Sequence, residues 1–201
     1  GCDKNLVDTE KMLGLLNGQG IIFTDDETEA DVILINTCCF IGDAKEESVN
    51  TILEMARYKE EGNLKALLVA GCLAQRYKQE ILDEIPEVDA ILGTTSYEEV
   101  AKVLEQVLMG SSGIHLSCFR DLSELPQVEA RRVVTTGGHY AFLKIAEGCD
   151  KRCTYCIIPY LRGPYRSVPI EQLVAEAGQL AEAGVKELIL VAQETTLYGK
   201  D

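Results

Sequence analysis

Apolar positions in the first half of the chain follow two alternating patterns. Continuous apolar runs, which are typical of parallel strands buried on both faces, lie at Val32–Asn36, Ala66–Ala70 and Ala90–Leu92. Between them apolar residues recur at helical spacing, which predicts helices at Val7–Leu16, Ala44–Tyr58, Ala74–Ile85 and Tyr97–Leu108. Strand and helix in alternation predict an α/β fold with a doubly wound parallel sheet.

The pattern changes at residues 111–138, which we interpret as a linker in which Ile114–Phe119 and Arg132–Val134 pair as short strands. One strand–helix–strand unit follows, at Tyr140–Ala146, Ile170–Ala183 and Glu187–Ala192. A barrel of eight such units needs about 200 residues or more. We therefore expect an N-terminal domain at 1–110 and the incomplete start of a barrel at 139–201. Because Gly1-Cys2 also looks like the end of a strand, we expect a fragment truncated at both ends.

Composition narrows the classes of function that we expect for this chain. The 201 residues are 46% apolar and 26% charged, with a formal net charge of −14. No apolar run approaches the roughly 18 residues of a membrane span, and the N-terminus does not resemble a secretory signal, so we expect a cytoplasmic protein without a membrane partner. The acidity argues against direct nucleic-acid binding by this portion. It suits a basic partner, although acidic faces that only maintain solubility explain it equally well.

Three cysteines form the most informative local motif. Cys149, Cys153 and Cys156 have the spacing Cys-x3-Cys-x2-Cys on a loop after a predicted strand. An iron–sulfur cube normally takes four thiolates, so three leave one iron open for a substrate or cofactor. A structural zinc site with His139 as fourth ligand is the alternative, but its usual paired spacing is absent. Disulfides are disfavoured because no secretory signal is present.

A second set of cysteines follows from topology. Cys38 and Cys72 each follow a predicted strand by two residues, and Cys2 precedes the first helix. Loops after parallel strands gather at one edge of a sheet, where ligands bind, so these three thiols should converge. Three unrelated buried thiols are the alternative. Cys39 and Cys118 have no such placement, and we expect them to serve in packing.

These residues together resemble the radical S-adenosylmethionine methylthiotransferase family over essentially the whole chain. The N-terminal motifs are Gly1-Cys2-Asp3-Lys4-Asn5, Asn36-Thr37-Cys38 and Gly71-Cys72-Leu73-Ala74-Gln75-Arg76. The second set of motifs comprises the Cys149 triplet, Ile158-Pro159, Arg162-Gly163 and Arg166-Ser167-x-Pro169. Within the family, Cys2–Asp8 and Val191–Gly199 resemble the branch that methylthiolates an aspartate of small-subunit ribosomal protein number twelve.

The resemblance implies two [4Fe-4S] clusters, one on Cys2, Cys38 and Cys72 and a second, S-adenosylmethionine-binding one on the Cys149 triplet. It implies S-adenosylmethionine as cofactor, an electron donor, and the β-carbon of an aspartate in a small-subunit ribosomal protein as the site modified. No catalytic residue is assigned beyond the cluster ligands. For cofactor binding we expect roles for Tyr155, Gln193 and Glu194.

Several alternatives remain open at this point. Tyr155 could only shield its cluster, and Arg162 and Arg166 could offset cluster charge or cap a loop. A transfer-RNA methylthiotransferase is the alternative enzyme, although that branch tends to carry Gln-Met-Asn after its first cysteine. A non-catalytic iron–sulfur or zinc module is the alternative of another class.

Overall fold

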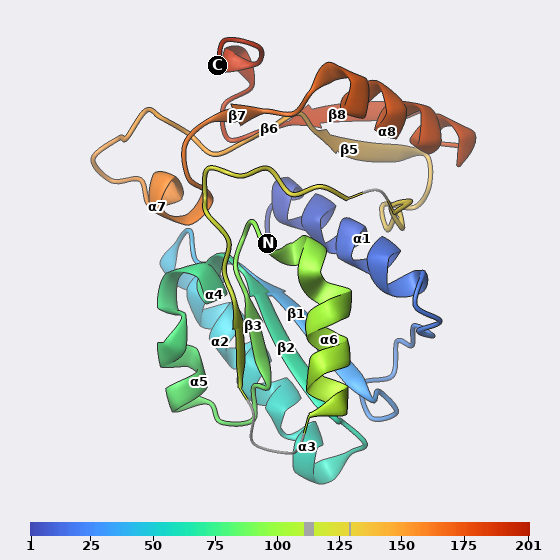
Figure 1. Ribbon diagram of the computed structural model, residues 1–201, viewed down its shortest axis with the longest axis vertical. Helices are drawn as coiled ribbons and strands as arrows, with labels where there is room; N and C mark the ends of the chain where they lie inside the picture. The colour runs from blue at the N-terminus through green and yellow to red at the C-terminus, as the bar shows by residue number, and fades with distance from the viewer. Residues whose placement is uncertain (111–114, 129) are drawn as a thin grey trace.

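A four-stranded parallel sheet organises the N-terminal part of the chain. The computed structural model describes residues 1–110, 115–128 and 130–201. In this sheet the order is β1-β2-β3-β4, with all neighbours parallel (Figure 1). The strands are β1 (Val32–Thr37), β2 (Ala66–Gly71), β3 (Ala90–Leu92) and β4 (Leu116–Cys118). The predicted α/β fold with a parallel sheet is therefore confirmed, and its three apolar runs are strands.

Helices cover both faces of this sheet, each through its own apolar core. One face packs on α1 (Asp3–Asn17) and α6 (Val100–Met109), which follows the short 3-10 helix η1 (Tyr97–Glu99). The other face packs on the helices of the β1–β2 and β2–β3 crossovers. These are α2 (Gly42–Ala56), the short α3 (Tyr58–Glu61), α4 (Cys72–Tyr77) and α5 (Gln79–Glu84). Because both faces are covered, β2 is buried along its whole length, which explains its uninterrupted apolar sequence.

The C-terminal part, residues 130–201, forms a second layer above the carboxyl ends of the first sheet (Figure 1). Its strands β5 and β8 pair in parallel, and α8 connects them, as the sequence predicted. A loop with three cysteines and a short helix lie between β6 and β7, which pair antiparallel. The bounds are β5 (Tyr140–Lys144), β6 (Ala146–Glu147), α7 (Ile158–Arg162), β7 (Arg166–Ser167), α8 (Ile170–Glu182), β8 (Glu187–Val191) and η2 (Thr195–Leu197).

Two local predictions were wrong. Leu116–Cys118 does not pair with Arg132–Val134; it pairs with β3 as the fourth strand of the sheet. The segment at Arg132–Val134 lies along α1, where Val133 N donates to Glu10 O. The helix expected at Ala74–Ile85 is divided into α4 and α5 at Lys78, whose φ of 44° is left-handed. The predicted domain limits stay a prediction, and residues 111–114 and 129 of the expected linker lie outside the described residues.

A buried network of charges joins the two parts. Lys144 of β5 is paired with Asp8 of α1 and donates to Glu147 Oε2 at 2.7 Å. Arg162 Nη1 donates to Asp8 Oδ2 at 2.7 Å and to Glu147 Oε2 at 3.2 Å. None of the four side chains is more than 5% exposed. Buried charges are tolerated only when they are paired in this way, so the network fixes how the parts fit together.

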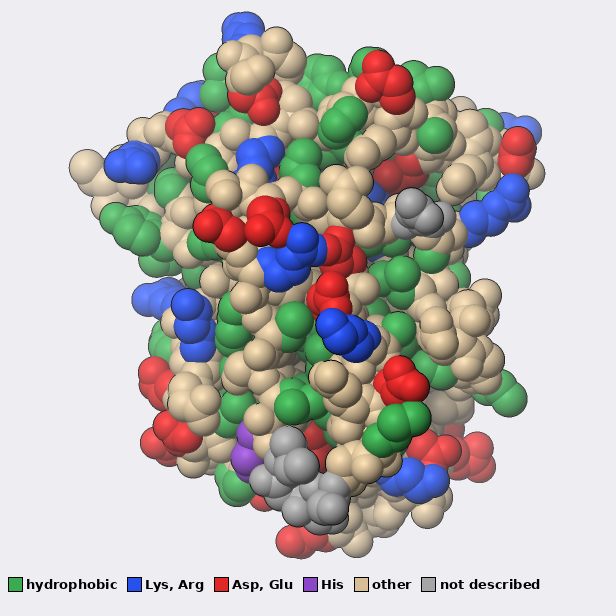
Figure 2. All heavy atoms as spheres, in the orientation of Figure 1, with side chains coloured by type: hydrophobic (Ala, Val, Ile, Leu, Met, Phe, Trp, Pro, Cys, Tyr) green, Lys and Arg blue, Asp and Glu red, His purple; other side chains and the backbone are tan. Residues whose placement is uncertain are grey.

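The surface carries both signs of charge. Figure 2 shows acidic and basic side chains interspersed over one face, and the basic ones coloured there do not merge into one patch. Among the residues that the structure describes, no helix has the length and apolar character needed to span a membrane.

Replacing Lys144 with methionine should destabilise the chain strongly. The substitution keeps an unbranched apolar side chain and removes the ammonium group. The buried carboxylates of Asp8 and Glu147 are then left with Arg162 as their remaining shared cation. Breaking a buried pair on one side costs about 3–5 kcal/mol. We expect a loss of that size in the free energy of unfolding, measured by urea denaturation.

The matched control is Lys65→Met. Lys65 pairs with Asp31 at 2.8 Å, but both side chains are more than half exposed. Exposed pairs contribute at most about 1 kcal/mol, so this variant should unfold close to the wild type. Equal losses in the two variants would contradict a structural role for the network.

Candidate metal centres

Two of the N-terminal cysteines are brought together by strand register. Thr37 of β1 is paired with Gly71 of β2, and each is followed at once by a cysteine, Cys38 and Cys72. The chain turns sharply here because Gly71 has a φ of +91°, and a Cβ on it would lie 2.3 Å from Asn36 Oδ1. Thr37 Oγ1 donates to Ala70 O and accepts from Leu73 N, which fixes the start of α4. Both thiols therefore leave the same edge of the sheet.

Side-chain amides attach the start of α1 to this edge. Asn5 Nδ2 donates to Asn36 Oδ1 at 2.9 Å and to Thr37 O at 3.2 Å, while Asn36 Nδ2 donates back to Asn5 O at 2.9 Å. Cys2 lies just before α1, in an exposed position, and its carbonyl accepts from Leu6 N. This reciprocal amide contact holds the start of α1, which Cys2 precedes, at the strand end that Cys38 follows.

The pKa of the Cys72 thiol responds to burial and to nearby charges. Burial raises the pKa of the Cys72 thiol, and the guanidinium of Arg162 opposes that rise by its charge and a hydrogen bond. Negative charge on Cys38 and Cys2 raises the same pKa further. Cys39 is buried, donates from Sγ to Cys72 O at 3.2 Å, and has its pKa raised to about 11 by burial. Its packing agrees with the role expected for it.

The second cysteine set lies on the loop between β6 and α7. Cys149 is half-buried and its N donates to Gly163 O at 3.1 Å, whereas Cys153 is exposed and its O accepts from Cys156 N at 2.9 Å. Gly148 has a φ of +79°, and a Cβ there would lie 2.0 Å from Pro164 O. Only glycine allows this close approach, which holds the start of the loop against its end.

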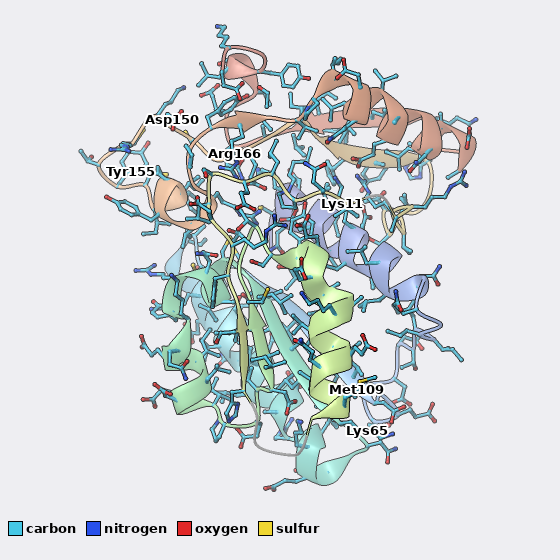
Figure 3. The ribbon with its side chains drawn as sticks, viewed as in Figure 1. Lys11, Lys65, Met109, Asp150, Tyr155 and Arg166 are labelled. Atoms are coloured by element: carbon cyan, nitrogen blue, oxygen red, sulfur yellow. The ribbon has the colours of Figure 1, made fainter. Side chains whose placement is uncertain are left out.

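The three residues expected to bind a cofactor lie near this loop but have different surroundings. Tyr155 lies at its outer side and is 88% exposed (Figure 3). Gln193 Nε2 donates to Glu147 Oε1 at 2.8 Å, and its Oε1 is buried without a hydrogen-bond partner among the described residues. Glu194 pairs with Lys151 of the loop, which lowers the pKa of its carboxyl to about 2 through hydrogen bonds from Lys151 and Thr196. The segment after β8 therefore contacts one residue before Cys149, Glu147, and one after it, Lys151.

The two arginines named from sequence have different surroundings. Arg166 donates to the carbonyls of Arg162 and Pro164, so it caps the backbone of this loop. Arg162 instead donates to two carboxylates, Asp8 of the N-terminal part and Glu147 of its own part. Sequence reasoning missed Lys144 and Glu147. The signals were a lysine within an apolar strand and a glutamate directly before Gly148-Cys149.

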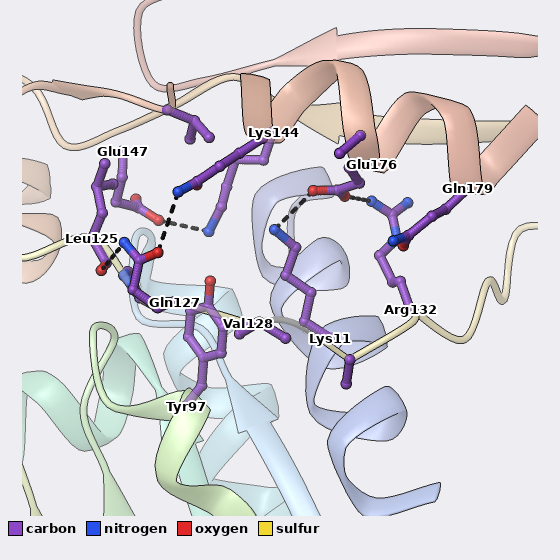
Figure 4. Close-up of a pocket in the computed structure, with 15 residues that line it drawn as sticks. Lys11, Tyr97, Leu125, Gln127, Val128, Arg132, Lys144, Glu147, Glu176 and Gln179 are labelled. Atoms are coloured by element: carbon purple, nitrogen blue, oxygen red, sulfur yellow. Dashed lines mark hydrogen bonds and ion pairs between the residues drawn. The ribbon is translucent and has the colours of Figure 1, made fainter. Parts of the chain in front are cut away.

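A cavity of about 390 Å³ lies beside the charged network (Figure 4). Tyr97, Lys144 and Glu147 line its inner side, and Lys11 and Glu176, 3.0 Å apart, lie at the α1–α8 side. Its lining includes none of the six cysteines of the two sets. It is therefore a space of mixed polar and apolar lining between the two parts of the chain, separate from the thiols.

The chemistry of the two thiol sets suits soft metal ions or iron–sulfur clusters, which thiolates prefer. Within the described ranges no group of three or more Cys, His, Asp or Glu stands in metal-binding geometry. Metal ligands commonly take their final geometry on binding, so the ligand assignments stay a prediction. The residues present fit such a group: three thiols at a fixed sheet edge, and three on a glycine-anchored loop.

Comparison with known families divides the chain in the same way. Residues 1–93, with Cys2, Cys38 and Cys72, match the family described as "Uncharacterized protein family UPF0004". Residues 143–201, with the Cys149 triplet, match the Radical SAM superfamily, whose members use S-adenosylmethionine and an iron–sulfur cluster.

Curated relatives match over the full length of the chain. Proteins named "Ribosomal protein uS12 methylthiotransferase RimO" are 65% identical in Lachnoclostridium phytofermentans, 54% in Acetivibrio thermocellus and 51% in Clostridioides difficile. Each alignment covers 100% of this chain and 45% of the relative. The chain thus spans a little less than half the length of these relatives. With both regions matched in order and at this identity, the chain belongs to the radical S-adenosylmethionine methylthiotransferase family.

Proposed function

We propose that this chain is part of a radical S-adenosylmethionine enzyme that adds a methylthio group to the β-carbon of an aspartate in ribosomal protein uS12. The observation that carries the proposal is the 65% identity, over all 201 residues, to a protein named for that activity. The structure supports it by carrying Cys38 and Cys72 at the ends of β1 and β2, Cys2 just before α1, and the Cys149 triplet on a separate loop after β6. We extend the proposal to a cytoplasmic location and to an external electron donor.

Each thiol set would hold one [4Fe-4S] cluster with an open iron. Cys149, Cys153 and Cys156 would hold the cluster that supplies the electron for reductive cleavage of S-adenosylmethionine. Cys2, Cys38 and Cys72 would hold the cluster at which sulfur is delivered. Three protein thiolates leave one coordination position for an outside ligand in either case.

Residues around the second loop suit the binding of S-adenosylmethionine. Within the part of the chain that the structure describes, the buried Oε1 of Gln193 has no hydrogen-bond partner, and a buried acceptor of this kind is costly unless a ligand N–H or O–H binds to it. Glu194, ionised and tied to Lys151, fixes the loop against the end of β8. Tyr155, exposed between two ligand cysteines, is placed to cover a bound adenine or the cluster.

Cys153→Ala tests the radical site. In the complete protein, anaerobic reconstitution should load close to eight irons per wild-type chain, as two cubes of four. The variant should hold about half that iron and should lose S-adenosylmethionine cleavage, because two thiols do not retain an open cube. Iron analysis and chromatographic detection of 5′-deoxyadenosine measure both effects. The control is Cys118→Ala, which removes a half-buried thiol of β4 and should load iron as the wild type does. Full cleavage activity in Cys153→Ala would refute the assignment of the Cys149 triplet as ligands of the radical cluster.

Cys72→Ala separates the roles of the two sites. Because the two sets lie in different parts of the chain, losing one need not remove the other. We expect the variant of the complete protein to produce 5′-deoxyadenosine under reducing conditions and to give no methylthiolated uS12, measured by mass spectrometry of the ribosomal protein. Methylthio product formed without Cys72 would show that sulfur does not pass through the N-terminal site.

Metal analysis of the wild-type protein separates the enzyme from the alternative. One zinc per chain without iron would favour a structural module.

A further inference from the structure

The side chains of Glu147 and Gln193 meet just beyond the ends of the two C-terminal parallel strands. Ile145 N donates to Val191 O at 3.0 Å, and Glu147 and Gln193 each lie two positions beyond one end of this hydrogen bond. Gln193 Nε2 donates to Glu147 Oε1 at 2.8 Å. Because Glu147 lies two residues before Cys149, the contact is at the base of the second cysteine loop.

The carboxylate of Glu147 is held in one orientation. Its Oε2 accepts from Lys144 at 2.7 Å and from Arg162 at 3.2 Å, and its Oε1 accepts from Gly148 N at 3.3 Å. The side chain is 1% exposed. A carboxylate bound to two cations offers acceptors and no donor. The direction of its hydrogen bond with Gln193 is therefore fixed, and the amide nitrogen must donate.

This constraint determines which end of the Gln193 amide remains for another partner. An amide carries its donor and its acceptor on different arms, so donation to Glu147 turns Oε1 away from the carboxylate. Oε1 is buried and has no hydrogen-bond partner within residues 1–110, 115–128 and 130–201. Reversing the amide would oppose two acceptor oxygens and leave a buried donor unpaired instead. The position beside Oε1 thus suits a hydrogen-bond donor.

We infer that Glu147 is a positioning residue for S-adenosylmethionine, which acts through Gln193 by presenting the amide oxygen to an N–H or O–H of the cofactor. The inference rests on the proposed function, because it requires S-adenosylmethionine at the Cys149 triplet. Glu147 itself binds no part of the cofactor. The amino group of the methionine moiety, the ribose hydroxyls and the adenine amino group are the donors that S-adenosylmethionine offers.

Binding of S-adenosylmethionine to the complete, reconstituted protein tests the inference without an activity assay. The protein is kept oxidised, so that no electron is available to cleave the cofactor, and equilibrium dialysis with radiolabelled S-adenosylmethionine gives the dissociation constant. Gln193→Met removes the amide and leaves the ion pairs of Glu147 in place. We expect the affinity to fall about tenfold, which is the size of one buried hydrogen bond.

Glu147→Gln tests the positioning role directly. The substituted side chain can donate as well as accept, so the Gln193 amide is free to turn. We expect a loss of affinity similar to that in Gln193→Met. If Glu147 acts through Gln193, the double variant should bind S-adenosylmethionine no more weakly than Gln193→Met alone.

Glu10→Gln is the matched control. Glu10 is 0% exposed, pairs with Arg132 at 2.9 Å and accepts from Thr135 N at 2.6 Å. It is therefore a buried, arginine-paired glutamate like Glu147, with its partners on the segment that precedes β5. Glu10→Gln should bind S-adenosylmethionine as the wild type does.

A further variant leaves Glu147 unchanged, which matters because loss of a buried charge can unfold the chain. Gln193→Glu keeps the shape of the side chain and places a second carboxyl group against Glu147. Two carboxylates in contact resist being ionised together, so the introduced group can donate to Glu147 only after it takes up a proton. Relative to the wild type at the same pH, we expect weak binding at about pH 9 and recovery toward about pH 6.

The outcomes separate the inference from the proposed function. Unchanged affinity in Gln193→Met, as expected if another part of the complete protein donates to the amide, would overturn the inference alone. Wild-type affinity of Gln193→Glu at about pH 9 would do the same, as would equal losses in Glu147→Gln and Glu10→Gln, or losses that add in the double variant. Wild-type protein that holds both clusters and does not bind S-adenosylmethionine would overturn the proposed function, and the inference with it.

Discussion

The rest of the structure depends on the hydrogen bonds and ion pairs that the buried carboxylate of Glu147 accepts. It is almost fully buried, and an unpaired charge in that position would cost several kcal/mol. Its oxygens accept from Lys144, Arg162, Gln193 and Gly148, which come from β5, α7, the end of β8 and the start of the cysteine loop. Buried ion pairs contribute little to stability over apolar residues of the same shape, but they allow few arrangements. The network therefore explains the relative placement of the two thiol sets better than it explains stability.

The N-terminal cysteine site depends on backbone geometry as much as the packing of the two parts depends on the charged network. Gly71 is the residue whose missing side chain lets β2 turn into α4, and Asn36 and Thr37 occupy the space that a larger residue would need. The amide contact between Asn5 and Asn36 then fixes the third segment. Side chains that hold ligand-bearing segments in place reduce the ordering that metal binding must supply. Cys38 and Cys72 thus follow paired ends of adjacent strands, and the segment that carries Cys2 is attached to the same strand end.

The sequence predicted those features that depend on local pattern. Strands β1, β2 and β3 were found because a sheet covered on both faces requires continuous apolar runs. The cysteine sets followed from spacing and from the rule that parallel strands end at one edge. The pairing of Leu116–Cys118 was missed because three residues carry no information about their neighbour. The shared partner of Lys144 and Arg162, Asp8, could not be predicted, because ion pairs between residues 136 and 154 positions apart leave no local signal of which residues pair.

The distribution of charge connects these observations. The chain has a formal net charge of −14, yet the buried acidic residues of the described ranges, Asp8, Glu10 and Glu147, are matched by Lys144, Arg162 and Arg166, and the side chain of Arg132 is also only 3% exposed. The excess of acid therefore lies outside the core, where water screens it. Thiols must lose protons to bind a metal, so an occupied site adds negative charge to the interior. Burial already opposes ionisation of Cys72, and the charge that most directly offsets this is the guanidinium of Arg162. Since the C-terminal part supplies that guanidinium, the N-terminal thiols have a complete electrostatic environment only when both parts of the chain are packed together.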